Sequence, residues 1–132
     1  MSVVIPCYLP NEEFIIEETI EWIMQKVEYS GRLSVIVVYN TPVELPEIQA
    51  RLAELQDALW PAGRSFRAMH VKDSRSKAAN LNAALKVVED PYVVIYDADH
   101  HPDPDSLILL WEKMSRCGVD CVQGSYYMRN LS

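Results

Sequence analysis

The sequence predicts an α/β fold: a Rossmann-like, mainly parallel sheet with helices on both faces. Short β-branched runs alternate four times with longer segments whose apolar residues recur every three or four positions. This alternation is typical of strand–helix units joined by right-handed crossovers. The run LSVIVVY at 33–39 is almost uniformly apolar, as expected for a strand covered on both faces. Since no repeat or flexible linker interrupts the pattern, we expect one domain over residues 1–132.

The first strand–helix unit lies at the start of the chain. Residues 2–6, SVVIP, form a β-branched run that ends at a proline, which predicts a short strand. Asn11 is placed to cap the following helix, and Gly31 to end it. The apolar residues of this helix fall on one face, namely Ile16, Ile20, Ile23 and Val27.

The second and third units follow the same scheme. After the strand at 33–39, a helix ends at Pro61 and Gly63, and its apolar positions are Leu45, Ile48, Leu52, Leu55 and Leu59. A weaker strand at 65–71 precedes a helix at about 76–89, whose expected core stripe is Leu81, Leu85 and Val88.

The fourth unit begins with the strand YVVIY at 92–96. Pro104 opens a helix that ends at Gly118, with an inner face of Leu107, Leu110, Trp111 and Met114. The run VDCVQGSYYM, from Val119, predicts a fifth strand.

Composition limits the classes of function. Nineteen acidic residues against twelve Lys and Arg give a net charge of −7, so we expect no nucleic-acid-binding surface, which would cluster Lys and Arg. Three cysteines without CxxC spacing argue against a disulfide framework or structural zinc and favour a reducing compartment. Without a signal peptide or an apolar run long enough to cross a bilayer, the chain is expected to be cytoplasmic.

The residues that follow each strand are the candidate site residues, because ligands of such sheets bind beyond the carboxyl ends of the strands. They are Pro6-Cys7-Tyr8, Asn40-Thr41, Lys72-Asp73-Ser74 and Asp97-Ala98-Asp99. We expect the polar side chains of this set to converge on one crevice.

Asp97 and Asp99 are candidate metal ligands. In an extended chain, residues two apart point the same way, and two neighbouring carboxylates repel each other unless a proton or cation lies between them. A hard divalent cation suits such a pair and takes its other ligands from water or phosphate oxygens. The alternative is that the two acids only form a turn. The adjacent His100 and His101 are not predicted to be ligands.

Lys77 and Asn80 form a second candidate group. Lys77 lies in the first turn of a predicted helix, where the helix dipole disfavours a cation, and a bound anion would explain its presence there. Asn80 can reach a polar ligand or a neighbouring loop. The alternative is a solvated lysine and an asparagine that hydrogen-bonds only to loops.

Several other sites lack sequence support. The chain has no glycine-rich dinucleotide or Walker-type motif. An aspartyl phosphatase would carry Asp-x-Asp-x-Thr, whereas the fifth position here is His101.

Five segments, in order along the chain, resemble the nucleotide-binding half of a family 2 glycosyltransferase of the inverting, A-type fold. They are SVVIPCYLPNEE, VIVVYNTP, DSRSKAANLNAAL, VVIYDADHHPDPDSL and CVQGSYYMRN. The resemblance covers essentially the whole chain. It implies a nucleoside-diphosphate-sugar as donor, with a UDP-sugar as the leading expectation.

The resemblance also assigns roles to residues. Asp97 and Asp99 would hold Mg²⁺ or Mn²⁺ on the donor diphosphate. Pro6, Tyr8 and Glu12 would line the base and ribose pocket, and Lys77 would lie near the phosphates or the sugar. The metal and the lysine would together stabilise the charge of the leaving diphosphate.

Two features depart from the family pattern. Many members carry an aspartate pair after the second strand, where this chain has Tyr39-Asn40, although Asn40 can still hydrogen-bond a base edge. The chain also ends at Ser132, before the catalytic base and the acceptor-binding segments, which membrane helices often follow in this family. We therefore expect an incomplete A-type domain that binds a nucleotide weakly without turning over a sugar, from a parent protein at the cytoplasmic face of a membrane.

Two other classes of function remain open. A non-catalytic nucleotide-binding or interaction module would be indifferent to metal. A metal-dependent nucleotidyltransferase or phosphatase would exchange pyrophosphate or release phosphate.

Overall fold

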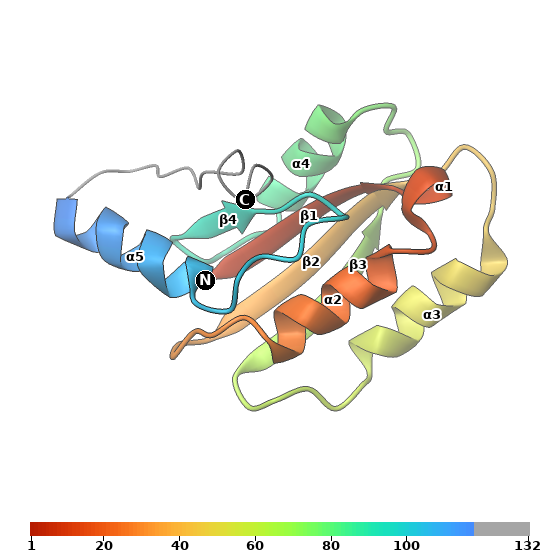
Figure 1. Cartoon of the computed structure of the whole chain (residues 1–132). Coiled ribbons are helices and arrows are strands. Elements are labelled where there is room, and N and C mark those ends of the chain that lie inside the picture. Colours follow the sequence, from red (N-terminus) through yellow and green to blue (C-terminus); the bar gives the residue numbers. More distant parts are fainter. Residues whose placement is uncertain (118–132) are drawn as a thin grey trace, which may run out of the picture.

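The computed structural model describes residues 1–117 and contains a four-stranded, all-parallel sheet. Helices cover both faces of this sheet (Figure 1), so the predicted fold class is confirmed. The predicted fifth strand lies outside the described residues. Among residues 1–117, no helix is both long and apolar enough to cross a bilayer. In chain order the elements are β1 (Ser2–Tyr8), α1 (Leu9–Glu12), α2 (Ile16–Gln25), β2 (Leu33–Asn40), α3 (Pro46–Gln56), β3 (Arg64–His70), α4 (Lys77–Leu85), β4 (Val93–Ile95) and α5 (Ser106–Cys117). The order of the strands across the sheet is β3-β2-β1-β4.

The central strand β1 is paired unequally on its two sides. It pairs with β2 along its whole length, but with β4 only from Ser2 to Val4. The backbone N–H and C=O groups of the even-numbered residues of β1 point toward β4. Val4 O, for example, accepts a hydrogen bond from Tyr96 N at 3.1 Å. Pro6 is the next residue on this side and has no N–H to donate. The strand therefore continues through Pro6, contrary to the prediction that Pro6 ends it, because the ladder to β4 has already finished there.

Alternate residues of the strands build two separate cores. On one face, buried strand residues pack against α2 and α3, whose buried residues include Ile20, Ile23 and Leu52. Full burial of each such aliphatic side chain stabilises the fold by roughly 1.5–3 kcal/mol. On the other face, Val4 and Val38 pack against Ala84 of α4. Figure 1 shows α2 and α3 together on one side of the sheet and α4 on the other.

The predicted first helix is in fact two helices. Pro10 occupies the first turn of α1, where its fixed φ favours helix initiation. Asn11 consequently lies inside α1 and does not cap α2, which begins at Ile16. The predicted stop at Gly31 is also wrong, because α2 ends at Gln25.

Two predicted core residues are exposed. Leu59 is fully exposed because α3 ends three residues earlier, at Gln56. Leu85 is 47% exposed, and the buried residues of α4 are Asn80 and Ala84. The other two members of the predicted stripe, Leu81 and Val88, are partly buried and pack against the core that contains Ala84.

Candidate functional site

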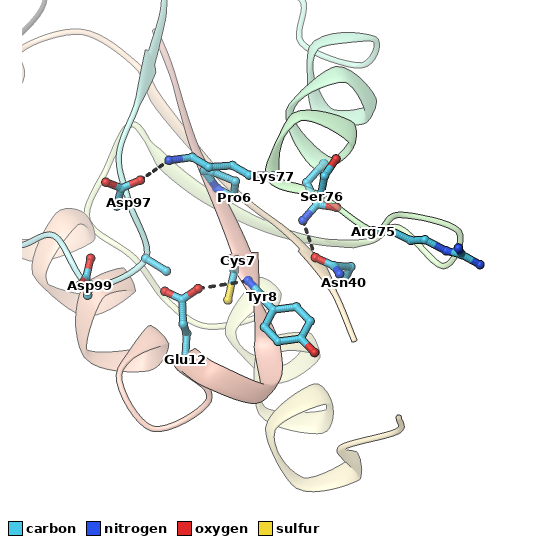
Figure 2. Close-up of a pocket in the computed structure, with 12 residues that line it drawn as sticks. Pro6, Cys7, Tyr8, Glu12, Asn40, Arg75, Ser76, Lys77, Asp97 and Asp99 are labelled. Atoms are coloured by element: carbon cyan, nitrogen blue, oxygen red, sulfur yellow. Dashed lines mark hydrogen bonds and ion pairs between the residues drawn. The ribbon is translucent and has the colours of Figure 1, made fainter. Parts of the chain in front are cut away.

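A pocket of about 320 Å³ opens at the carboxyl ends of β1, β2 and β4, beside the start of α4 (Figure 2). All residues to which the sequence assigned a binding role line this pocket, and those roles stay predictions. Thr41, which was also in the candidate set, does not line it. The segment after β3 contributes Arg75, Ser76 and Lys77 to the lining of the pocket. Lys72, Asp73 and Ser74, which were expected there, do not line it. The lining residues are Pro6, Cys7, Tyr8, Glu12, Asn40, Arg75, Ser76, Lys77, Asn80, Asp97, Ala98 and Asp99.

The acidic pair lies in a turn and not in an extended segment as expected. β4 ends at Ile95, and the backbone reverses so that His100 N donates to Asp97 O at 3.0 Å. The turn directs Ala98 into the core, where it is 2% exposed. Asp97 and Asp99 still border the same pocket, so the turn keeps the two carboxylates together by a different backbone geometry.

Lys77 forms an ion pair with Asp97, and Figure 2 shows its ammonium group directed at the Asp97 carboxylate. The side chains are 57% and 50% exposed, and an exposed ion pair contributes about 0–1 kcal/mol. This pair offsets the unfavourable position of a cation in the first turn of α4. Because the pair is weak, either partner can exchange it for another charged group at little cost.

Glu12 adds a third carboxylate to the pocket. Its Oε1 accepts a hydrogen bond from Tyr8 N at 3.1 Å. Partial burial raises the pKa of Glu12, the Tyr8 N–H lowers it, Asp99 and Asp97 raise it further by repulsion, and Lys77 lowers it. Loss of a proton from Glu12 therefore adds negative charge to a place where two carboxylates already repel it.

The end of β2 is joined to α4 through two buried amides. Asn80 Nδ2 donates to Asn40 Oδ1 at 2.8 Å, and Asn40 Nδ2 donates to the Ser74 carbonyl at 3.4 Å. Because a carbonyl can only accept, Ser74 fixes the orientation of Asn40, and Asn40 in turn fixes that of Asn80. This leaves Asn80 Oδ1 buried and without a hydrogen-bond partner among the described residues.

The end of β1 presents three different groups to the pocket. Pro6 contributes no donor, and Tyr8, which is 40% exposed, offers an aromatic ring at the mouth. Cys7 is almost fully buried in the core. Burial, and to a smaller extent the charge of Glu12, raises the pKa of the Cys7 thiol, so this group is a poor nucleophile.

Two lining residues, Arg75 and Ser76, were not selected from the sequence as site residues. The structure shows that Ser76 caps α4, with its side chain accepting from Ala79 N at 3.1 Å. Arg75 points away from the acidic residues (Figure 2). The spacing of two basic residues around Ser76, immediately before a helix, was the available signal for this cationic side of the pocket.

The chemistry of the donor set decides which ions fit. Within residues 1–117, no three acidic, histidine or cysteine side chains are grouped closely enough to hold a metal ion alone. Mg²⁺ is commonly bound by one or two carboxylates, with water and substrate phosphates completing its shell. The hard oxygens of Asp97 and Asp99 fit that mode of binding.

Comparisons with known proteins agree with this architecture. Residues 2–132 match the family described as Glycosyl transferase family 2. The chain is 32% identical over 89 residues to the cellulose synthase catalytic subunit [UDP-forming] of Xanthomonas axonopodis pv. citri (strain 306), covering 51% of this chain and 12% of that protein. The crystal structure of S. aureus TarS 1-349 superimposes with a TM-score of 0.66 at 18% identity, covering 87% of this chain.

These relatives differ in what they support. At its low identity, TarS shows the fold alone. The chain spans 32% of the TarS chain and 12% of the cellulose synthase subunit, so it corresponds to a part of each. The family match extends over nearly every residue, and it shows that this chain belongs to glycosyl transferase family 2.

Proposed function

We propose that this chain binds the sugar donor of a metal-dependent glycosyltransferase, a nucleoside-diphosphate-sugar whose nucleotide is UDP. The observation that carries the proposal is the meeting of Asp97, Asp99 and Lys77 in one pocket at the carboxyl ends of the sheet. Acidic oxygens and a cationic side chain are the two kinds of group that a metal-bound diphosphate requires. The cellulose synthase relative, which is named as UDP-forming, favours UDP.

The diphosphate end of the donor would lie between the acidic turn and α4. Asp97 and Asp99 would hold Mg²⁺ or Mn²⁺, which when bound neutralises charge on the diphosphate as the glycosyl–phosphate bond breaks. Lys77 would leave Asp97 and turn its ammonium group to a phosphate oxygen. That exchange is inexpensive because the ion pair it replaces is half exposed.

The nucleoside end would lie toward β1 and β2. The exposed ring of Tyr8 offers a face on which a base or ribose can pack. Asn40 and Asn80 place neutral amides on this side of the pocket, and Glu12 supplies a carboxylate near Tyr8 for a ribose hydroxyl. Charged groups would thus contact the phosphates, while neutral and aromatic groups contact the base.

Isothermal titration of the chain with UDP, in Mn²⁺ and separately in EDTA, tests this proposal. We expect binding only with Mn²⁺. Asp99→Asn keeps the side-chain shape but removes a ligand charge, and it should weaken binding at least about tenfold, or about 1.4 kcal/mol.

Asp105→Asn is the matched control, because Asp105 is exposed on the same loop and does not line the pocket. It makes the same change in net charge and should leave the affinity for UDP unchanged. Equal losses in both variants, or binding of UDP in EDTA, would contradict the metal assignment.

A further inference from the structure

Helix α2 holds the turn that carries the two aspartates. Thr19, which is completely buried, donates from Oγ1 to the carbonyl of Ala98 at 2.6 Å. The same Thr19 oxygen lies 3.0 Å from His101 Nε2. One hydroxyl on α2 therefore contacts the loop on both sides of Asp99.

The contact continues along the loop and along the helix. The Trp22 ring stacks on His101 with 5.6 Å between ring centroids and 16° between planes, and Trp22 Nε1 donates to Pro102 O at 2.6 Å. Beyond the end of α2, Glu28 N donates to Pro104 O at 2.7 Å. The carbonyls of Ala98, Pro102 and Pro104 are thus all fixed from one direction.

The hydrogen-bond pattern determines the tautomer of His101. A threonine hydroxyl carries one hydrogen, and a backbone carbonyl can only accept. Since Thr19 donates its hydrogen to Ala98, its oxygen must accept from His101. His101 consequently carries a hydrogen on Nε2, and this nitrogen is directed at α2.

We propose that Thr19 is a positioning residue for the carboxylates of Asp97 and Asp99, and that His101 serves as an anchor of the same loop and not as a metal ligand. Ala98 lies between the two acids, so fixing its carbonyl fixes the peptide plane that leads into Asp99. A cation site requires its ligands to be held within about 0.5 Å of the working geometry. The effect on the cation rests on the proposed function, whereas the anchoring of the loop does not.

Replacement of Thr19 tests the positioning role. Thr19→Val keeps the branched shape but removes the hydroxyl, which frees the Ala98 carbonyl and His101 Nε2. We expect the affinity for UDP in Mn²⁺ to fall about tenfold, as for other losses of a group that orients a metal ligand. Thr19→Ser keeps the hydroxyl and should restore the affinity to within about twofold of the wild type.

Ile20→Val is the matched control for lost stability. Ile20 is the next buried residue on α2 and belongs to the core, and its truncation costs about 0.5–1.5 kcal/mol. If Thr19→Val weakens UDP binding no more than Ile20→Val does, or if Thr19→Ser fails to restore it, the positioning role is wrong.

Two readouts need no ligand and separate this inference from the proposed function. Nitrogen-15 NMR of His101 should show the Nε2–H tautomer in the wild type and in Thr19→Ser, and a changed tautomer population in Thr19→Val. Hydrogen exchange at the His100 amide should accelerate in Thr19→Val alone. Unchanged exchange and tautomer would overturn the anchoring, even if UDP binds. Normal anchoring in a chain that fails to bind UDP would refute only the proposed function.

Discussion

Two connections join strand ends to helix α4, and they differ in almost every physical respect. Asn40 and Asn80 are 7% and 1% exposed, neutral, and joined by a hydrogen bond of 2.8 Å. Asp97 and Lys77 are charged and about half exposed. The amide connection therefore serves to hold α4 against the sheet, whereas the ionic connection can open when a charged ligand arrives.

Burial explains why the neutral amides form the stronger of the two connections. A buried polar group that loses its partner costs about 1–3 kcal/mol, because water cannot replace the lost hydrogen bond. Exposed carboxylate and ammonium groups are well hydrated when they separate, so their pairing contributes about 0–1 kcal/mol. The two ends of one pocket thus combine a fixed wall with an exchangeable one.

The largest change in stability is expected from Asn40→Ala. This substitution leaves the buried Asn80 amide without its partner, and we expect the free energy of unfolding to fall by about 2 kcal/mol. Urea denaturation measures the loss. In a cycle with Asn80→Ala, the double variant should lose less than the sum of the single variants; strict additivity would mean that the two amides do not act as a pair.

A smaller, pH-dependent change is expected from Glu12→Gln. Because burial raises the pKa of Glu12 in the folded state, the folded protein binds this proton more tightly than the unfolded chain does. The stability from Glu12 is therefore present at acid pH and is lost as the pH rises through the folded-state pKa. Glutamine cannot ionise, yet it can still accept from Tyr8 N.

Urea denaturation between pH 4 and pH 7 checks this prediction. The free energy of unfolding of Glu12→Gln should increase relative to the wild type as the pH rises. Parallel pH profiles for the two proteins would show that the surroundings of Glu12 do not raise its pKa in the folded state.

The smallest change in stability is expected from Lys77→Ala, which removes only the half-exposed ion pair with Asp97. The free energy of unfolding should change by less than about 1 kcal/mol, although titration with UDP in Mn²⁺ should show weaker binding. A loss as large as that of Asn40→Ala would mean that the ionic connection also holds α4 in place, and the contrast between the two walls would fail.

Much of the fold and the membership of the site could be predicted from the sequence. Periodicity located all four described strands, and the rule that parallel strands present their carboxyl ends together brought Tyr8, Asn40 and Asp97 into one set. Those features depend on local patterns of burial. The break between α1 and α2 was missed because the apolar residues of α2 keep their period while Pro10 starts a separate helix.

The interior contacts of the site could not be predicted in the same way. Thr19 and Ala98 are 79 residues apart, and nothing in the composition of either segment indicates that they meet. Asn80 was expected to reach a polar ligand or a neighbouring loop, yet it is buried in α4 and donates to Asn40, which comes from another element. Pairing between distant polar groups depends on tertiary geometry, which hydrophobic periodicity does not encode.

Pro6 has a consequence for how the pocket is maintained. Because Pro6 has no backbone N–H, it cannot extend the hydrogen-bond ladder toward β4. Strands β1 and β4 therefore separate at a fixed point along β1. The entrance is thereby built into the covalent chain and exists before any ligand arrives. A ligand that binds here would therefore lose no binding free energy to the separation of the two strands.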